Sequence, residues 1–290
     1  MGTVPPLRRA EDDPKRQKRF RRGMYLLPSL FTSGNIALGY YALSQAILGS
    51  VDHPHHFDNA AKAIGIAVVF DFMDGLIARL TNTASEFGKQ LDSLADVITF
   101  GVAPAMLAWM WGFRMLPELD GTPELRVRLM QVGAIATFVF LIAGASRLAR
   151  FNIQANPQPS NPGRPDRKYF VGMPIPAGAG VLAAVVHFWH GYPIHSAWFA
   201  ALWAALIFSA AFLMVSTWRY LSLKGFNFRH RVPARNLIVI GLLIAAVWFF
   251  SDITLFILAL TYMLSGVFAR LAYIFKRPSP PAYHEASEAR

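Results

Sequence analysis

The chain has 290 residues, of which 54% are apolar and only 16% are charged, and its net charge is +11. Soluble globular domains are usually about 25% charged, so this composition argues against an ordinary soluble protein. Cysteine is absent, which excludes disulfides, thiolate catalysis and cysteine-ligated metal sites. The apolar residues fall in long uninterrupted runs, so a membrane protein is expected and a nucleic-acid partner is not.

Eight segments are long and apolar enough to cross a hydrocarbon core of about 30 Å as helices. We expect them at 27–49, 61–80, 93–113, 130–151, 174–192, 197–221, 235–251 and 253–276. The predicted fold class is therefore all-α, a polytopic integral membrane protein with about eight transmembrane helices. A basic cytoplasmic arm at 1–24 precedes the transmembrane domain at 25–276, and a disordered cytoplasmic tail at 277–290 follows it.

The distribution of basic residues tests this division and sets the orientation. Of the 28 lysines and arginines, 24 fall before the first segment, at or after the end of the last one, or in every second connection and the segment ends that border it. The alternate connections and the segment ends that border them hold only the remaining four. Because cytoplasmic loops carry an excess of Lys and Arg, both termini are expected to be cytoplasmic.

Acidic residues gather in one part of the chain. Five of the 17 lie between Asp71 and Asp96, and Asp71 and Asp74 sit inside an apolar span. An aspartate near the centre of a membrane helix costs about 2.5–3.5 kcal/mol, so two of them need a compensating partner. At about 100° per residue, Asp71 and Asp74 share one helix face, and Asp92 and Asp96 share a face of the next helix. The short connection makes the two helices antiparallel neighbours, whose carboxylates are expected to converge near the cytoplasmic surface.

Four converging carboxylates repel one another unless cations lie between them. Oxygen ligands without His or Cys suit Mg²⁺ or Mn²⁺. Gly75 and Gly88 leave room for a ligand to approach the backbone, and Arg79 is placed to contact an anion such as a diphosphate. Two other readings exist: the aspartates could pair with Arg79 and Lys89 to hold helices together, or mark a cation pathway. A pathway predicts carboxylates spread across the membrane depth, whereas these cluster at one end.

The spacing of these residues resembles a known signature. Asp71-x2-Asp74-Gly75-x2-Ala78-Arg79-x8-Gly88-x3-Asp92-x3-Asp96 matches the complete pattern of the CDP-alcohol phosphotransferase family. The resemblance implies transfer of a phosphatidyl or related group from a CDP-linked donor to an alcohol, with release of CMP. It also implies a helical membrane enzyme, commonly a homodimer, with a two-metal site facing the cytoplasm.

Further stretches resemble the phosphatidylserine synthase branch of that family. They are PSLFTSGNIALGYYA at 28–42, LDSLADVITFGVAPA at 91–105, ASRLARFNI at 145–153, YFVGMPIPAGAG at 169–180 and LMVSTWRYLSLK at 213–224. The branch implies CDP-diacylglycerol as donor and L-serine as acceptor. Thr99 stands where the branch pattern leads us to expect serine, and it retains the hydroxyl.

The resemblance also implies roles for individual residues. Asp71, Asp74 and Asp92 would hold one Mg²⁺ or Mn²⁺ ion, and Asp96 would help to hold a second. The residues expected to line the CDP-diacylglycerol site are Gly34, Asn35, Gly75, Ala78, Arg79, Ser85 and Gly88. A serine hydroxyl is too weak an acid to attack unaided at neutral pH, so it needs a general base, for which Asp96 is the candidate.

Two weaker signals lie outside the signature. Arg147 and Arg150, at the expected cytoplasmic end of the fourth span, are candidates for binding the acceptor carboxylate or a lipid phosphate, or are topology anchors. His53, His55 and His56 lie in an expected outside loop, remote from the aspartates, and are expected to be surface residues.

The sequence therefore predicts a metal-dependent CDP-diacylglycerol–serine O-phosphatidyltransferase. Its expected location is the prokaryotic inner membrane, with the active site facing the cytoplasm and membrane lipids around it. A sister enzyme that uses glycerol 3-phosphate, inositol phosphate or choline is the nearest alternative. A cation transporter is the alternative from another class.

Overall fold

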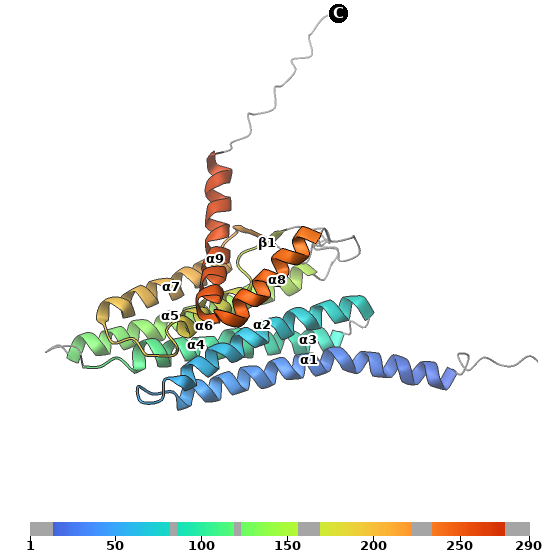
Figure 1. Ribbon diagram of the computed structural model, residues 1–290, viewed down its shortest axis with the longest axis horizontal. Helices are drawn as coiled ribbons and strands as arrows, with labels where there is room; N and C mark the ends of the chain where they lie inside the picture. Colours follow the sequence, from blue (N-terminus) through green and yellow to red (C-terminus); the bar gives the residue numbers. More distant parts are fainter. Residues whose placement is uncertain (1–13, 82–85, 119–122, 156–168, 222–233, 276–290) are drawn as a thin grey trace, which may run out of the picture.

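A computed structural model describes residues 14–81, 86–118, 123–155, 169–221 and 234–275 of the chain. Within these ranges the chain is almost wholly helical, with one pair of three-residue strands. Most of the helices run roughly along the long axis of the molecule (Figure 1). The predicted helical class is confirmed for the bulk of the described chain, and the strand pair is an addition to it.

Two long helices form the N-terminal part of the bundle. Helix α1 spans Pro14–Leu48 and α2 spans His55–Thr81, and they make the most extensive helix pair in the described chain. Both contain the spans expected there. Because α1 begins at Pro14, residues 14–24 of the expected basic arm belong to this helix, while the rest of that arm lies outside the described residues.

The carboxylate-bearing helix continues without a break from Glu86 to Arg114. It consists of α3 (Glu86–Asp96), the π-helical segment η1 (Val97–Val102), α4 (Ala103–Trp109) and a second π-helical segment, η2 (Met110–Arg114). Single π-helical turns are frequent at functional sites, and η1 begins directly after Asp96.

Helix α1 lies very close to η1. The Thr99 hydroxyl donates to the backbone oxygen of Asn35 at 3.0 Å. A Cβ atom on Gly39 would lie only 2.5 Å from the Thr99 hydroxyl oxygen, so the close approach requires glycine. The hydroxyl that Thr99 retains therefore ties α1 to the helix that carries Asp92 and Asp96.

The next three helices alternate along the chain with a short strand pair, in the order α5, β1, α6, α7, β2. Helix α5 spans Pro123–Ala155 and packs on α7, which spans Ala197–Val215, while α6 spans Ile175–Phe188 and is largely buried. Strand β1 (Tyr169–Val171) pairs antiparallel with β2 (Arg219–Leu221), with Phe170 opposite Tyr220.

The end of α7 differs from the prediction. The expected span reached residue 221, but α7 ends at Val215 because the chain turns into β2. Gly172, just after β1, has a φ of 78°, and a Cβ there would lie 2.4 Å from the Met214 backbone oxygen. Hydropathy alone does not locate such a turn, since Trp218, Tyr220 and Leu221 are interspersed with Ser216, Thr217 and Arg219 and allow the apolar run to be extended to residue 221.

The last two helices are joined by a tight turn at Phe250. Helix α8 spans Ala234–Phe249 and α9 spans Ser251–Phe275. Helix α9 is inclined to the bundle, and its C-terminal part projects beyond it (Figure 1).

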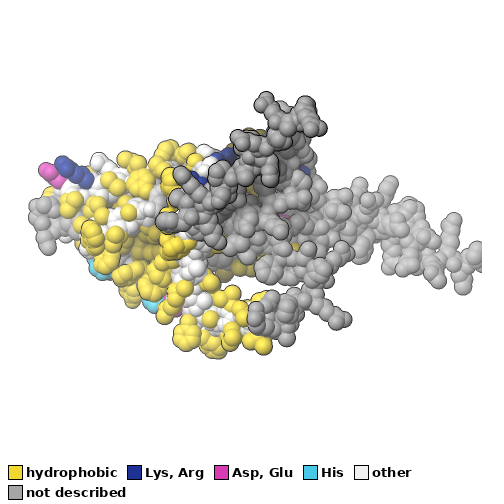
Figure 2. Space-filling view, turned by 90° about the horizontal axis from the view of Figure 1, so that it is seen from above, with side chains coloured by type: hydrophobic (Ala, Val, Ile, Leu, Met, Phe, Trp, Pro, Cys, Tyr) yellow, Lys and Arg dark blue, Asp and Glu magenta, His cyan; other side chains and the backbone are white. Residues whose placement is uncertain are grey.

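Large apolar side chains cover the outside of the described bundle. Ile135 and Phe138 of α5 are 57% and 62% exposed, and Trp248 of α8 is 82% exposed. Figure 2 shows hydrophobic side chains over much of the described part of one face, with only a few charged side chains among them. A soluble monomer rarely exposes apolar patches of this extent, so the surface fits a chain surrounded by lipid.

Four segments of the described chain are long and apolar enough to cross a membrane: Phe87–Arg114, Pro123–Ile153, Ala197–Val215 and Ser251–Leu271. Ile175–Phe188 and Ile238–Phe249 are shorter apolar helices. Helix α2 is long enough but carries Lys62, Asp71 and Asp74 within its apolar stretch. The structure thus fits an integral membrane protein, and the number of eight spans stays a prediction.

A polar cluster joins three helices at the end of α2 remote from the aspartates of the signature. The His187 Nδ1 of α6 lies 2.5 Å from Asp58 Oδ1 of α2, and its Nε2 lies 2.9 Å from the Ser251 hydroxyl oxygen of α9. Lys62 completes the cluster, with its Nζ 2.7 Å from Asp58 Oδ2. We call these four residues the His187 clamp. Burial raises the pKa of the Asp58 carboxyl, but hydrogen bonds from His187 and Lys62 outweigh it, so the pKa lies below its ordinary value.

The clamp predicts unequal costs for two substitutions. His187→Ala should lower the free energy of unfolding by about 1.5–3 kcal/mol, because it leaves the buried Asp58 carboxylate without this partner. Lys62→Ala should cost about 0–1 kcal/mol, because the Lys62 side chain is 51% exposed. Unfolding in detergent micelles measures both values.

The same clamp predicts a pH dependence. Since the folded pKa of Asp58 is lowered, its stabilisation is complete above the ordinary pKa and is lost as the pH falls through the folded value. Asp58→Asn should therefore flatten the acid side of the stability profile. An acid side identical to that of the unsubstituted protein would contradict this role.

Candidate functional site

Three of the four signature aspartates come together at one end of the bundle. Asp71 of α2 and Asp92 and Asp96 of α3 each place a carboxylate oxygen within 4.8 Å of the others. They are the one group of three or more His, Asp or Glu side chains with metal-ligand spacing in the described part of the chain. We call these three residues the carboxylate cluster.

The cluster forms because two helix faces meet at a short connection. Asp71 is near the C-terminal end of α2, and α3 begins only five residues after α2 ends. Asp92 and Asp96 are one turn apart and therefore lie on one face of α3. Helix α1 packs on both α2 and α3, which holds the two carboxylate faces in place.

Asp74 lies beside the cluster but is engaged differently. It is 7% exposed, and the Thr32 hydroxyl of α1 donates to its Oδ2 at 2.5 Å. Asp74 is not among the residues within 4.8 Å of one another. The structure therefore brings three of the expected ligands together and shows the fourth oriented by Thr32.

The donor set fits a divalent cation. Two carboxylates about 4 Å apart repel by about 4 kcal/mol at a protein surface, so three of them need positive charge nearby. Oxygen ligands alone are the coordination that Mg²⁺ and Mn²⁺ favour. The carboxylates of Asp71, Asp92 and Asp96 are close enough together to share divalent cations, and Asp74 lies one turn from Asp71 on α2.

The residues expected to contact the donor lie around α1 and α2. The side-chain amide of Asn35 is 1% exposed, and neither its nitrogen nor its oxygen has a hydrogen-bond partner among the described residues. A buried amide of this kind is costly unless a ligand or water satisfies it. A Cβ atom on Gly75 would meet nothing within 4 Å, so open space lies beside that backbone.

The other expected donor residues are only partly described. Gly34 packs against Phe70: a Cβ atom on Gly34 would lie 3.2 Å from the Phe70 ring. Gly88 lies on α3, two residues after the helix begins. Ala78 and Arg79 belong to α2, but their side chains lie outside the described part, as does Ser85. The expected contact of Arg79 with a diphosphate thus stays a prediction.

The two arginines of α5 differ in their surroundings. Arg147 is 7% exposed and has electrostatic interactions with Asp96 and with Tyr262 of α9. Arg150 is half-buried, and its guanidinium donates to the Val215 backbone oxygen at 3.3 Å. Asn152 donates to the Ser93 hydroxyl at 2.8 Å, which ties the end of α5 to the carboxylate-bearing helix. Arg147 therefore faces the site, while Arg150 fixes α5 to the end of α7.

Thr32 and Tyr262 were not singled out from the sequence. Thr32 lies three residues before Asn35 and so on the same face of α1, and this spacing could have identified Thr32 as a site residue. Tyr262 lies 166 positions from Asp96 in an ordinary apolar helix, and nothing in its local sequence marks it.

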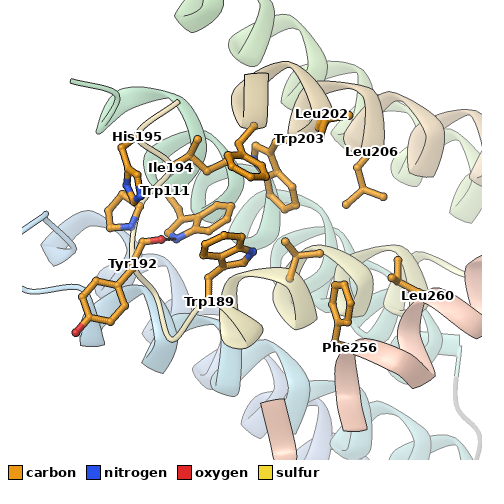
Figure 3. Close-up of a pocket in the computed structure, with 13 residues that line it drawn as sticks. Trp111, Trp189, Tyr192, Ile194, His195, Leu202, Trp203, Leu206, Phe256 and Leu260 are labelled. Atoms are coloured by element: carbon orange, nitrogen blue, oxygen red, sulfur yellow. Dashed lines mark hydrogen bonds between the residues drawn. The ribbon is translucent and has the colours of Figure 1, made fainter. Parts of the chain in front are cut away.

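A separate cavity of about 340 Å³ lies at the opposite end of the bundle. Figure 3 shows Trp111, Trp189 and Trp203 around it, with Phe256 and Leu260 of α9 along one side. The cavity lies next to the C-terminal end of α6. The His187 clamp joins this end of α6 to the start of α2, so the cavity is far from Asp71. Its lining is almost wholly apolar and offers no carboxylate, so it is not the site of the expected chemistry.

The three histidines of the α1–α2 connection also lie at that end. His53 and His55 are exposed, and the His56 Nδ1 lies 2.7 Å from the Gln45 side-chain oxygen. They precede α2 or form its first turn, some 16 residues before Asp71. The structure thus keeps them away from the carboxylate cluster.

The fold and the site define a helical membrane protein with an acidic cluster suited to a divalent metal. A family model described as CDP-alcohol phosphatidyltransferase matches residues 25–211. The CDP-diacylglycerol–serine O-phosphatidyltransferase of Helicobacter pylori is 34% identical over 201 residues, which are 69% of this chain and 74% of that protein. The chain belongs to the CDP-alcohol phosphatidyltransferase family, whose members depend on divalent metals.

Two further relatives carry the same name. The protein of Mycobacterium leprae is 30% identical over 259 residues, which are 87% of this chain and 77% of that protein. The protein of Bacillus subtilis is 32% identical over 165 residues, which are 57% of this chain and 77% of that protein.

The Thr32–Asp74 hydrogen bond generates a prediction. Groups that orient metal ligands typically contribute 10–100-fold to metal affinity or activity. Thr32→Val should raise the divalent-metal concentration needed for half-maximal activity by about tenfold or more, whereas Thr32→Ser, which keeps the hydroxyl, should behave like the parent chain. Equal metal requirements for Thr32→Val and Thr32→Ser would show that this hydroxyl does not orient a ligand.

Proposed function

We propose that this enzyme transfers the phosphatidyl group of CDP-diacylglycerol to the hydroxyl of L-serine, giving phosphatidylserine and CMP. The observation that carries the proposal is the carboxylate cluster of Asp71, Asp92 and Asp96 within a chain of this family. The serine acceptor is supported by relatives named for serine in bacteria, yeast and an archaeon.

The donor would lie along α1 and α2. Asp71, Asp74 and Asp92 would hold one Mg²⁺ or Mn²⁺ ion and Asp96 would help to hold a second; when bound, the ions neutralise charge on the diphosphate and polarise it. Around the donor we place Gly34, Asn35, Gly75, Ala78, Arg79, Ser85 and Gly88. The buried Asn35 amide and the open space at Gly75 support this placement.

We assign the role of general base to Asp96. It is 8% exposed, belongs to the carboxylate cluster, and interacts electrostatically with Arg147 of α5. Asp96 would take the proton of the serine hydroxyl as its oxygen forms a bond to the lipid phosphorus. The bond from that phosphorus to the CMP oxygen breaks, CMP leaves, and phosphatidylserine stays in the bilayer.

We further propose eight membrane helices within a domain at 25–276, with the cluster and both termini on the cytoplasmic side of a prokaryotic inner membrane. The uneven distribution of Lys and Arg supports this orientation. Gln90 on α3 is exposed, and the chain has no cysteine, so a cysteine placed there should react with a membrane-impermeant reagent only from the cytoplasm. Reaction only from the outside would reverse the orientation.

We also propose a homodimer, as the family resemblance implies. Helix α8 supports it, since Ile238 and Leu242 are 63% and 66% exposed on a helix with few neighbours in the described chain. Light scattering of the detergent-solubilised protein measures the mass, and a single copy would contradict the dimer.

An acceptor panel tests the proposed function. Purified protein with CDP-diacylglycerol and a divalent metal should release CMP rapidly with L-serine and at least about tenfold more slowly with glycerol 3-phosphate, inositol phosphate or choline. Phosphatidylglycerophosphate as the main product would reject serine as acceptor. If no acceptor led to CMP release, the transferase activity would be rejected, and the cation transporter would be the remaining alternative.

A comparison of aspartate variants tests the assignment of the base. Asp96→Asn keeps the size of the side chain but removes its basicity, so turnover should fall by about 10²–10⁴-fold. Donor binding should survive better, because Asp71, Asp74 and Asp92 remain. Asp71→Asn should instead weaken metal-dependent binding of CDP-diacylglycerol itself. Near-normal turnover of Asp96→Asn would show that another group takes the proton.

A further inference from the structure

Helix α9 connects the two ends of the bundle. It begins at Ser251, whose hydroxyl oxygen lies 2.9 Å from His187 in the clamp. One turn later Phe256 stacks on Phe188 of α6, with ring centroids 4.5 Å apart. At 1.5 Å per residue, Tyr262 lies about 16 Å along the helix from Ser251. Tyr262 therefore lies well along α9 from the His187 clamp, in the direction of the carboxylate cluster.

Strand β2 holds this part of α9 in place. The Tyr220 hydroxyl donates to the Met263 backbone oxygen at 3.1 Å, and Tyr220 is fully buried. A Cβ atom on Gly266 would lie 2.2 Å from the Tyr220 ring, so the strand and the helix are in close contact. The Tyr262 ring lies 5.6 Å from the Tyr220 ring. These contacts define where the Tyr262 side chain lies.

Arg147 interacts with both Tyr262 and the carboxylate cluster. The Arg147 side chain is buried, its guanidinium lies 5.8 Å from the centre of the Phe151 ring, and it interacts electrostatically with Asp96 and with Tyr262. Three elements far apart in the sequence thus bring a carboxylate, a guanidinium and a phenol to one place. Arg147 comes from α5, whereas the described donor contacts that we expect come from α1, α2 and the start of α3, so we assign the arginine to the acceptor side of the cluster.

We propose that Tyr262 and Arg147 form the subsite that binds the α-carboxylate of the amino-acid acceptor. The inference rests on the proposed function and adds a specificity-determining residue from α9 to it. A guanidinium binds a carboxylate through parallel hydrogen bonds, and a phenol hydroxyl donates to a remaining lone pair of the same group. With the carboxylate held there, the acceptor hydroxyl and ammonium extend towards Asp96. Glycerol 3-phosphate, inositol phosphate and choline have no carboxylate to place in this subsite.

Kinetics of the full-length protein with both substrates test the subsite. Tyr262→Phe removes one hydrogen bond to a charged group, so the serine KM should rise by about tenfold or more, with kcat and the KM for CDP-diacylglycerol nearly unchanged. Arg147→Gln should raise the serine KM further. Tyr192→Phe is the matched control, because Tyr192 is exposed at the opposite end of the bundle, and its kinetics should equal those of the parent chain.

A second measurement separates recognition from folding. L-serine methyl ester keeps the hydroxyl and the amine but lacks the charged carboxylate. It should compete poorly with serine in the parent enzyme, and the difference between the two should shrink in Tyr262→Phe. Unchanged CDP-diacylglycerol binding shows that the variant is folded.

These measurements distinguish failure of the proposed function from failure of the proposed subsite. If the parent chain makes no phosphatidylserine, the proposed function fails. If it makes phosphatidylserine but Tyr262→Phe keeps the serine KM and the discrimination against the methyl ester, the subsite is wrong. A Tyr262→Phe variant that loses serine and CDP-diacylglycerol affinity equally would also overturn it, since that pattern indicates a structural role.

Discussion

Mutual repulsion among the carboxylates of Asp71, Asp92 and Asp96 is the constraint on which the rest of the structure depends. Three oxygens within 4.8 Å are unfavourable unless a cation joins them and the surrounding helices hold them together. Helix α1 supplies much of that support, because Thr32 hydrogen-bonds Asp74 and the Asn35 backbone accepts a hydrogen bond from Thr99. The first helix is therefore part of the site, although it contributes no member of the cluster.

Polar groups within the apolar bundle gather at its two ends. At one end His187 joins Asp58 to Ser251, and at the other the cluster faces Arg147. Each end meets the requirement that a buried charge find a partner, since an isolated one is expensive in an apolar environment. Helix α9 contacts both ends, which links the clamp to the proposed acceptor subsite.

The sequence predicted the helices and the acidic site well, because both depend on local patterns. Runs of apolar residues set the helix positions, and the one-turn spacing of Asp92 and Asp96 placed them on one face. The strand pair and the end of α7 could not be predicted, since they depend on a turn at Gly172 against the Met214 backbone. The position of Tyr262 beside Arg147 depends on the packing of α9 on β2, a contact between distant segments that no local pattern encodes.

Binding of Mn²⁺ to the purified protein, followed by the loss of the electron paramagnetic resonance signal of the free ion, tests the central claim most directly. The account predicts about two ions per chain in the presence of CDP-diacylglycerol. Asp92→Asn should lower the affinity for Mn²⁺ by about tenfold or more. Asp252→Asn is the control: it also removes a carboxylate, but at the start of α9, at the end of the bundle remote from the cluster, and it should leave the affinity unchanged. Equal Mn²⁺ binding by the parent chain and Asp92→Asn would contradict the claim that the carboxylate cluster is the metal centre.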